Sequence, residues 1–289
     1  MTVLFNRVAV IGVGLIGGSI ARALKKNQVC NHITGYTRRE SELKKAVELG
    51  VIDDYNSSIA DAVKAADLVI IAVPMGLFGY VFQEMRDSLS DNTLITDVGS
   101  AKGSVINAAK KVFQELPQGL VPGHPIAGNE KSGVEASFDS LFENRCTILT
   151  PTENSSPQSV SLVSEMWQRI GAKVVSMSAE HHDLVLAATS HLPHVLAFSL
   201  VDTLSRMHDH SEIFQFAAGG FRDFTRIASS DPIMWRDICL HNKDAILKVL
   251  KLYESHIKGL EQAIAEQDSV ALEAIFTRAK KARDEHVIQ

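Results

Sequence analysis

Apolar and polar positions follow two alternating patterns in the first 180 residues of the chain. Short, continuous apolar runs at residues 8–11, 32–36, 67–73 and 93–98 predict buried parallel strands. Between them, apolar residues at helical spacing predict helices at residues 41–49, 59–66, 77–89 and 103–116. This alternation of strand and helix predicts an α/β fold of the Rossmann type, with a doubly wound parallel sheet.

The pattern changes in the second half of the chain. Apolar runs at residues 146–150 and 173–177 flank a helical stretch at residues 157–170 and are the last strand signals. From residue 179, helical periodicity predicts helices at residues 184–204, 219–237 (broken at Asp231-Pro232), 241–252, 257–264 and 272–287. We therefore expect an α/β domain at residues 1–178 and an all-helical domain at residues 179–289.

A glycine motif joins the first strand to the first helix. Gly12 permits a tight turn, Gly14 lets the backbone approach a pyrophosphate, and Gly17 allows close packing of helix on strand. The amides that open the helix, at Leu15 and Ile16, would face the negative charge of the phosphates. The motif therefore predicts a dinucleotide site, and the alternative is a glycine turn that binds no ligand.

The end of the second strand bears on the choice of cofactor. An acidic residue at this place binds both hydroxyls of the adenosine ribose, whereas this chain has Thr37, Arg38 and Arg39. A hydroxyl followed by two arginines suits a 2′-phosphate, so we predict NADP in preference to NAD as cofactor. The alternative is that both arginines begin the next helix in solvent.

Two more strand ends are expected at the cofactor crevice, because ligands of such sheets bind at the carboxyl ends of the strands. Val73 and Pro74 follow one of these strands, and Ser100 follows the next. Ser100 is a candidate to hydrogen-bond a substrate hydroxyl or a nicotinamide amide, and the alternative is a helix cap. Lys102 is equally well explained as a surface charge at the start of a helix.

Residues 120–133 contain many glycines and prolines, so we predict a loop there. This segment carries His124, Glu130 and Lys131. The ordinary pKa of histidine suits proton transfer near neutral pH, and Pro125 would stiffen the backbone beside His124. The segment is therefore a candidate active-site loop, with an ordinary surface histidine as the alternative.

The helical half carries two further motifs. Pro193, with His191 and His194 on either side, opens the hydrogen-bond ladder of a helix that is apolar almost all round. Such a helix predicts a homodimer interface. In the second motif, at residues 219–237, Arg226 offers a planar fork for a carboxylate and Asp223 lies one helical turn before it. The alternative for this pair is a surface ion pair.

Composition narrows the classes of function. The chain has 289 residues, 45% of them hydrophobic, and a net charge of −5 from 29 basic and 34 acidic residues that are interspersed, which argues against nucleic acid as a partner. Cys30, Cys146 and Cys239 lie far apart without metal-ligand spacing, so we expect reduced thiols and no metal site. No apolar run reaches the ~18 residues of a membrane span, and we expect a cytoplasmic protein without membrane contact.

Five ordered segments together resemble one enzyme family over nearly the whole chain. They are VIGVGLIGGS, DVGSAKG, GHPIAGNEKSG, EHHD followed by SHLPH, and FRDFTRIASSDPIMWRDI. These segments resemble those of the prephenate and arogenate dehydrogenases of tyrosine biosynthesis. The resemblance implies oxidative decarboxylation of prephenate or arogenate with hydride transfer to NAD or NADP, giving 4-hydroxyphenylpyruvate or tyrosine. Nothing in the sequence separates the two substrates.

The resemblance also implies roles for matching residues. His124 matches the catalytic histidine, Ser100 lines the site beside it, and Arg226 matches the anchor of a substrate carboxylate. The other positions implied to bind substrate are His194, Glu130, His182, Asp223 and Trp235, with His182 less securely matched because His181 is its neighbour.

Two alternative functions remain at this point. One is another dehydrogenase on the same plan, of the 3-hydroxyacid type or a pyrroline carboxylate reductase, although the chain lacks the Gly-rich helix with a catalytic Lys of the former. The other is a non-catalytic dimer that binds NADP as a sensor.

Overall fold

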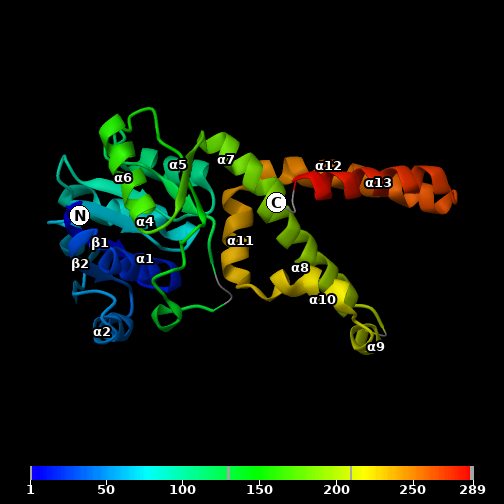
Figure 1. Cartoon of the computed structure of the whole chain (residues 1–289), viewed down its shortest axis with the longest axis horizontal. Helices are drawn as coiled ribbons and strands as arrows, with labels where there is room; N and C mark the ends of the chain where they lie inside the picture. The colour runs from blue at the N-terminus through cyan, green and yellow to red at the C-terminus, as the bar shows by residue number, and fades with distance from the viewer. Residues whose placement is uncertain (1, 129–130, 209, 287–289) are drawn as a thin grey trace. The chain divides into compact units, whose positions relative to one another are not determined.

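The computed structural model describes residues 2–128, 131–208 and 210–286. Its main sheet is five-stranded and parallel, with the order β3-β2-β1-β4-β5. The predicted doubly wound sheet is therefore confirmed (Figure 1). The two-residue β3 was not predicted. The strands are β1 (Phe5–Ile11), β2 (Cys30–Tyr36), β3 (Asp54–Tyr55), β4 (Leu68–Ile71) and β5 (Leu94–Asp97).

Helices cover both faces of this sheet because the strand residues alternate between two cores. Val8 and Val10 of β1 pack on the face that α1, α2 and α6 cover, whereas Ala9 and Ile11 face α3, α4 and α5. These helices are α1 (Leu15–Lys26), α2 (Glu40–Glu48), α3 (Ile59–Val63), α4 (Phe78–Met85), α5 (Lys102–Val112) and α6 (Pro157–Arg169).

A second, three-stranded sheet holds the residues that follow. It consists of β6 (Gly123–Pro125), β7 (Cys146–Leu149) and β8 (Lys173–Ser176), with β6 antiparallel to β7. The prediction of a loop was therefore wrong for residues 123–125. Glycine and proline are tolerated there because β6 is an edge strand, in which His124 pairs with Ile148.

The helical half begins with α7 (Ala179–Leu186), which continues through a π-helical turn (Ala187–His191) into α8 (Leu192–Ser205). The irregularity expected near Pro193 is this π turn, which ends immediately before α8. Three more helices follow, and Asp231 caps the last of them by accepting a hydrogen bond from the Met234 amide at 2.8 Å. They are α9 (His210–Gln215), α10 (Gly219–Thr225) and α11 (Pro232–His241).

The chain divides into two compact units, residues 1–243 and 244–289. The first contains both sheets and α7 to α11, so the residues of the candidate site lie in one unit. The second contains nearly all of α12 (Lys243–Ala265) together with α13 (Ser269–His286). The prediction of separate helices at residues 241–252 and 257–264 was wrong, because residues 253–256 contain neither glycine nor proline to end a helix.

The helical stretch Ala179–Ser205 is long and apolar enough, at 27 residues, to cross a membrane by length and composition. From the sequence we expected no apolar run long enough to span a membrane. That expectation considered continuous runs, whereas the apolar residues of this stretch are interrupted by histidines and Asp183. Only 22% of its most apolar window is buried within the chain. One such helix is weak evidence for a membrane span, because apolar helices of other kinds pass the same test.

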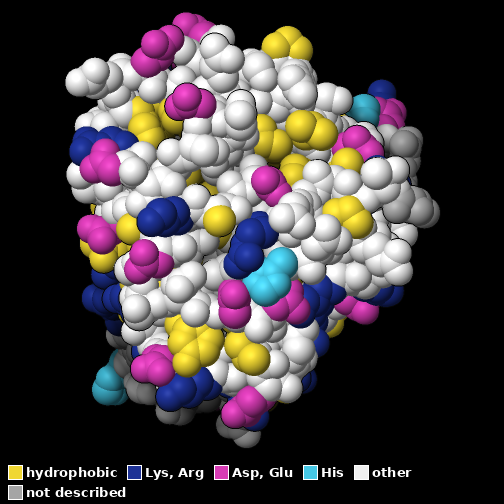
Figure 2. Space-filling view, turned by 90° about the vertical axis from the view of Figure 1, so that its left-hand side faces the viewer, with side chains coloured by type: hydrophobic (Ala, Val, Ile, Leu, Met, Phe, Trp, Pro, Cys, Tyr) yellow, Lys and Arg dark blue, Asp and Glu magenta, His cyan; other side chains and the backbone are white. Residues whose placement is uncertain are grey.

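Charged side chains of both signs are interspersed on the face of the molecule that Figure 2 shows. Most of the surface pairs are local, such as Lys44 with Glu40 and Lys258 with Glu254, each one helical turn apart. Such exposed pairs contribute little to stability, so burial of apolar surface is the main stabilising term.

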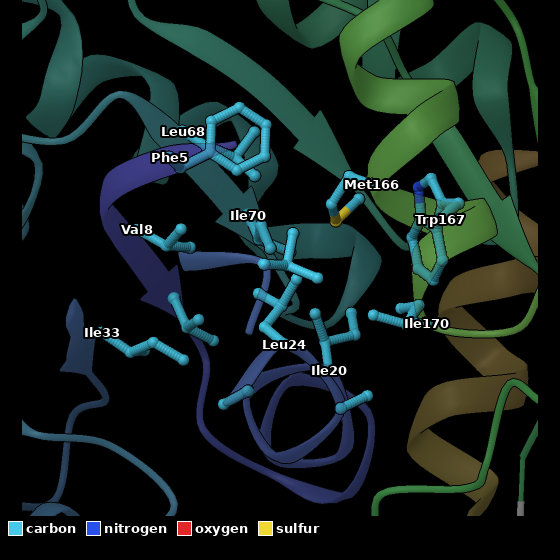
Figure 3. Packing of buried hydrophobic residues seen from close by; sticks show 14 of the residues in the cluster. Phe5, Val8, Ile20, Leu24, Ile33, Leu68, Ile70, Met166, Trp167 and Ile170 are labelled. Atoms are coloured by element: carbon cyan, nitrogen blue, oxygen red, sulfur yellow. The ribbon is translucent and has the colours of Figure 1, made fainter. Parts of the chain in front are cut away.

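The core on the α1 face is shown in Figure 3, where Ile20 and Leu24 of α1 face strand residues such as Val8. Trp167 of α6 is fully buried there and packs edge-on against Phe142, with ring centroids 5.3 Å apart. Its indole nitrogen is buried without a hydrogen-bond partner among the described residues. A buried N–H without a partner lowers the contribution of Trp167 to the stability of the fold. Trp167 therefore stabilises the core mainly through the volume that its ring fills.

We expect Trp167→Ala to lower the free energy of unfolding by about 3–5 kcal/mol, because it opens a large cavity. Trp167→Phe should cost about 1 kcal/mol or less, because the smaller ring also removes the unsatisfied N–H. Urea unfolding of both variants beside the unmodified protein measures the difference. Equal losses in the two variants would contradict this account of the core.

Candidate active site

The turn after β1 has the backbone that the glycine motif predicts. Gly12 has a φ of 101°, and a Cβ on it would overlap the carbonyl oxygen of Ala72. A Cβ on Gly17 would overlap the carbonyl oxygen of Gly12. At Gly14, in contrast, a Cβ would meet nothing within 4 Å. Two of the glycines are therefore required by close packing, whereas the third faces open space of the kind a dinucleotide phosphate needs.

The same turn lies at the switch point of the sheet, where strand order reverses between β1 and β4. The Ala72 amide donates to the carbonyl of Ile11 at 2.7 Å, which holds the two strand ends together. Val73 is half-buried beside Gly12, and Pro74 is exposed. Helix α1 starts at Leu15 and Ile16 without a side-chain cap, so its first amides fit an anion. The residues present therefore fit a pyridine dinucleotide.

The end of β2 presents its two arginines differently. Arg39 forms an ion pair with Glu42, one helical turn later, and the Thr37 hydroxyl also donates to Glu42, at 3.4 Å. Arg38 is exposed, and its charge acts on Tyr36, whose pKa is nevertheless raised, chiefly by burial. Arg38 is therefore the better placed of the two to take a further anion.

A buried ion pair lies beneath the site. The ammonium of Lys102, which is 0% exposed, contacts the Asp97 carboxylate and donates to the carbonyl of Gly123 at 2.5 Å. Asp97 in turn accepts from the amides of Gly99 and Gly123 at 2.7 and 3.2 Å. The interpretation of Lys102 as a surface charge was therefore wrong. The pair thus bonds both the amide and the carbonyl of Gly123, the residue before His124. These bonds hold β6 against β5 and α5.

Helix α5 is capped from another element. Its N-cap residue, Ala101, makes no side-chain cap, and the Asp183 carboxylate of α7 accepts instead from the amides of Lys102 and Gly103 at 2.7 and 2.9 Å. The main chain of Asp183 is also held, because Asn242 donates to its carbonyl at 2.8 Å. Asp183 thus joins α7 to the start of α5.

Asp183 also begins a chain of side chains that ends at His124. One oxygen of its carboxylate lies 2.8 Å from Nδ1 of His182, and Nε2 of His182 lies 2.9 Å from Nδ1 of His124. The two imidazole rings meet edge to face, with centroids 5.1 Å apart. His182 is fully buried, whereas His124 is partly exposed and keeps Nε2 outside this chain. The arrangement leaves Nε2 of His124 as the atom available to a substrate.

Three histidines of the site, His124, His191 and His194, have a lowered pKa. Burial is the main cause that lowers the pKa of His124 well below 6.5, and the Lys102 ammonium adds to it. Burial likewise lowers the pKa of His191 to about 4, with Asp183 opposing the shift. The pKa of His194 is lowered by burial and by the charge of Arg226, although its hydrogen bond to Ser190 opposes this. At neutral pH these rings can accept protons.

A second group of residues lies on α8, α10, α11 and the turn Arg226–Ser229. His194 stacks on Trp235 with ring centroids 3.7 Å apart, and donates from Nδ1 to the carbonyl of Ser190 at 2.8 Å. Arg226 is exposed and close enough for its charge to act on His194. Asp223 lies on α10, one helical turn before Arg226, and its orienting role stays a prediction.

The remaining predicted residues are less closely tied to this group. Ser100 is half-buried at the end of β5, and its hydroxyl has no hydrogen-bond partner among the described residues. Glu130 lies outside the described residues. No group of three or more metal-ligating side chains occurs among the residues that are described.

Sequence reasoning assigned no role in the site to several residues that shape it: Asp97, Lys102, Asp183, His191 and Asn242. Asp97 and Lys102 lie in the DVGSAKG segment, and Asp183 lies in the EHHD segment. Both segments were identified from the sequence, but the roles of these three residues were not. Asn242 follows α11 and donates to Nδ1 of His191 at 3.1 Å. No sequence pattern indicates a contact across 51 residues.

Comparison with known proteins adds to this geometry. The family model for the nucleotide-binding domain of prephenate dehydrogenase matches residues 20–176, and that for its dimerization domain matches residues 178–278. The chain is 42% identical to cyclohexadienyl dehydrogenase of Zymomonas mobilis over 98% of this chain and 96% of that one. It is also 42% identical to prephenate dehydrogenase of Bacillus subtilis, over 96% of this chain and 76% of that one.

A solved structure is similar over almost its whole length. Prephenate dehydrogenase from Aquifex aeolicus, in complex with hydroxyphenyl propionate and NAD+, superposes with a TM-score of 0.90 and 39% sequence identity. The match covers 97% of this chain and 98% of that one. The predicted fold class, with a helical part after the Rossmann sheet, agrees with this similarity.

Proposed function

The chain belongs to the prephenate dehydrogenase family and is an NAD(P)-dependent oxidoreductase, and we propose roles for its residues in the oxidative decarboxylation of prephenate or arogenate. The observation that carries these roles is the hydrogen-bonded chain from Asp183 through His182 to His124. The alternatives considered from sequence, another class of dehydrogenase or a non-catalytic sensor, are not favoured by the relatives.

The reaction requires removal of hydride from the ring carbon that carries the 4-hydroxyl, with loss of the hydroxyl proton. The resulting dienone loses CO2 from the ring carboxylate and becomes aromatic, which supplies the driving force. The nicotinamide ring of the cofactor, when bound, supplies the hydride acceptor. The protein must bind the substrate carboxylates and provide a base for the hydroxyl proton.

In this proposal His124 is the base. It is kept neutral by burial and by the Lys102 ammonium, and its Nε2 is the nitrogen that His182 does not occupy. Ser100, at the end of β5, is the second catalytic residue, because its hydroxyl is not taken up by another described residue. Its position after β5 also makes it a contact for the cofactor.

Arg226 is the proposed anchor for a substrate carboxylate, since its guanidinium is exposed and lies near His194. The stack of His194 on Trp235 supports a flat surface for the substrate ring, with Nε2 of His194 as a free acceptor. His182, Glu130 and Asp223 complete the substrate-binding set that we propose.

The cofactor site consists of the glycine turn, with Leu15 and Ile16, and of Val73, Pro74 and the end of β2. We propose NADP as the preferred cofactor because Arg38 is available for a 2′-phosphate. Arg39 and Thr37 contribute less, because both already contact Glu42.

We also propose that two copies of the chain associate through the helical half. Within one chain, only Ala197 of α8 is fully buried, although the helix is predominantly apolar. A second copy that covers this helix would remove the exposed apolar surface from water. The three unpaired cysteines suit a reducing compartment, and we place the protein in the cytoplasm.

The proposed function is tested by following nicotinamide absorbance with NADP and with NAD, offering prephenate and arogenate separately. Turnover with one or both substrates supports the assignment and identifies the preferred pair. Absence of turnover with all four pairs, in protein that binds NADP, would overturn it.

The neutral state of His124 predicts the pH profile of kcat/KM. Because the pKa of His124 lies well below 6.5, activity should be level at neutral pH and should fall through one ionisation at a more acid pH. His124→Asn should lower kcat by about 10²- to 10⁴-fold and abolish this acid limb. His181→Asn is the matched control, because that histidine is exposed. Normal turnover with an unchanged acid limb in His124→Asn would refute the role.

The two arginines at the end of β2 should differ in their effect on cofactor choice. Arg38→Ala should lower kcat/KM for NADP by about tenfold or more while leaving that for NAD nearly unchanged, because it removes a charge-assisted hydrogen bond to the 2′-phosphate. Arg39→Ala should have a smaller effect, because Glu42 already occupies that guanidinium. If neither substitution changes the ratio of the two cofactors, the preference for NADP has another origin.

The dimer is tested by the molar mass in solution. One chain has a mass of 31.6 kDa, and light scattering of the purified protein should give twice this value. Leu200→Glu places a charge on the partly exposed face of α8 and should shift the protein toward the single-chain mass. A single-chain mass for the unmodified protein at micromolar concentration would contradict the proposal.

A further inference from the structure

Asp183 makes contacts that exceed what a helix cap needs. Its carboxylate accepts from two amides at the start of α5 and also contacts Nδ1 of His182 at 2.8 Å. A carboxylate in its ionised form can only accept hydrogen bonds. The proton between Asp183 and His182 must therefore be carried by Nδ1 of His182.

The proton on Nδ1 of His182 also determines where the proton of His124 lies. A neutral imidazole has one donor and one acceptor nitrogen, so a neutral His182 with its proton on Nδ1 accepts at Nε2. Nδ1 of His124, at 2.9 Å, must then be the donor. In a neutral His124 the remaining nitrogen, Nε2, is left with the lone pair. The position of one carboxylate thus determines which nitrogen of His124 can take a proton.

We propose that Asp183 is a positioning residue that fixes the tautomers of His182 and His124, and so keeps the basic nitrogen of His124 available to the substrate. The proposal rests on the proposed role of His124 as the base. Asp183 does not contact the reacting atoms, and acts through His182 alone. Its bonds to the amides of Lys102 and Gly103 hold the carboxylate in the orientation that this role needs.

The charged and titratable groups that act on His124 come from three elements. They are Lys102 at the start of α5, His182 on α7 and His191 in the π turn. Each of these lowers the pKa of His124, as does its burial. The contribution of Asp183 is therefore directional and reaches His124 through a hydrogen bond, rather than through a charge that faces its ring.

Two substitutions of Asp183 separate positioning from capping. In Asp183→Asn the amide oxygen can keep the bond from the Gly103 amide, while the amide nitrogen takes the Oδ1 position. There it gives up the bond from the Lys102 amide and donates to Nδ1 of His182. This moves the proton of His182 to Nε2 and that of His124 to Nε2. The basic nitrogen would then be lost, as in the wrong-tautomer variant of the serine protease triad, where kcat falls about 10⁴-fold. In Asp183→Ala nothing forces either tautomer, so part of the activity should remain.

We expect kcat of Asp183→Asn to lie about tenfold or more below that of Asp183→Ala, with KM changed little in both. A purely structural role predicts the opposite order, because asparagine caps a helix well and alanine does not. Thermal unfolding of the two variants should follow the capping order, with Asp183→Asn the more stable. An activity order that follows the stability order would overturn the proposal.

A readout without turnover tests the same inference. In protein with ¹⁵N-labelled histidine, the protonated and unprotonated ring nitrogens have separate NMR shifts, and His124→Asn identifies the signals of His124. The unmodified protein should show an unprotonated Nε2 on His124, and Asp183→Asn should show an unprotonated Nδ1. An unprotonated Nδ1 in the unmodified protein would overturn the proposal, even if Asp183→Asn fails to fold. Failure of the proposed function would instead appear as absence of turnover in the unmodified protein, with these shifts as expected.

Discussion

The buried ion pair of Lys102 and Asp97 is the interaction on which the geometry of the site depends. Both side chains are excluded from water, and together they bind the amide and the carbonyl of Gly123 from two sides. Charges so placed are tolerated only when each has its partners, because leaving one of them alone in the interior costs about 3–5 kcal/mol. The pair therefore allows one position of β6 relative to β5 and α5, and His124 is the next residue of that strand. Rigidity of the site comes from this requirement rather than from the short sheet itself.

Local patterns were sufficient to predict the sheet and its helices, because each strand and helix repeats its own apolar spacing within a few residues. The same reasoning identified the glycine turn, since its conformational demand at Gly12 is local. It failed for β6, because the partner that makes residues 123–125 a strand, β7, lies some twenty residues later and glycine and proline are poor strand formers. It failed for Lys102 for a related reason. A lysine at a helix start is normally solvated, and only the position of Asp97 at the end of β5 makes its burial possible.

The helical half shows the same division between what is local and what is not. The motif around Pro193 correctly signalled an irregular helix, and the π turn before it turns His191 inward, where it is buried beside Asn242. That Asp183 of α7 caps α5 was not predictable, because the two residues that it bonds lie about eighty positions earlier. These long-range contacts connect the two halves of the site. Three histidines of this largely apolar helical stretch are held in defined positions by hydrogen bonds. His182 bonds to the Asp183 carboxylate, His191 to the Asn242 amide and His194 to the Ser190 carbonyl.

Burial is the main cause that lowers the pKa of both His124 and His194, and two cations add to it. Lys102 and Arg226 act on His124 and His194 respectively, and each lowers the pKa of the histidine that it faces. Each neutral imidazole is therefore a weak base in the free protein, because a proton on it would be poorly solvated and repelled by the nearby cation. The proposed substrate carries two carboxylates, and a carboxylate bound near a cation offsets its charge. A substrate carboxylate bound at Arg226 should therefore raise the pKa of His194, whereas Lys102 is buried and already paired with Asp97, so its effect on His124 remains. The charge that selects an anionic substrate thus acts on His194, whereas burial and Lys102 set the basicity of His124 with or without substrate.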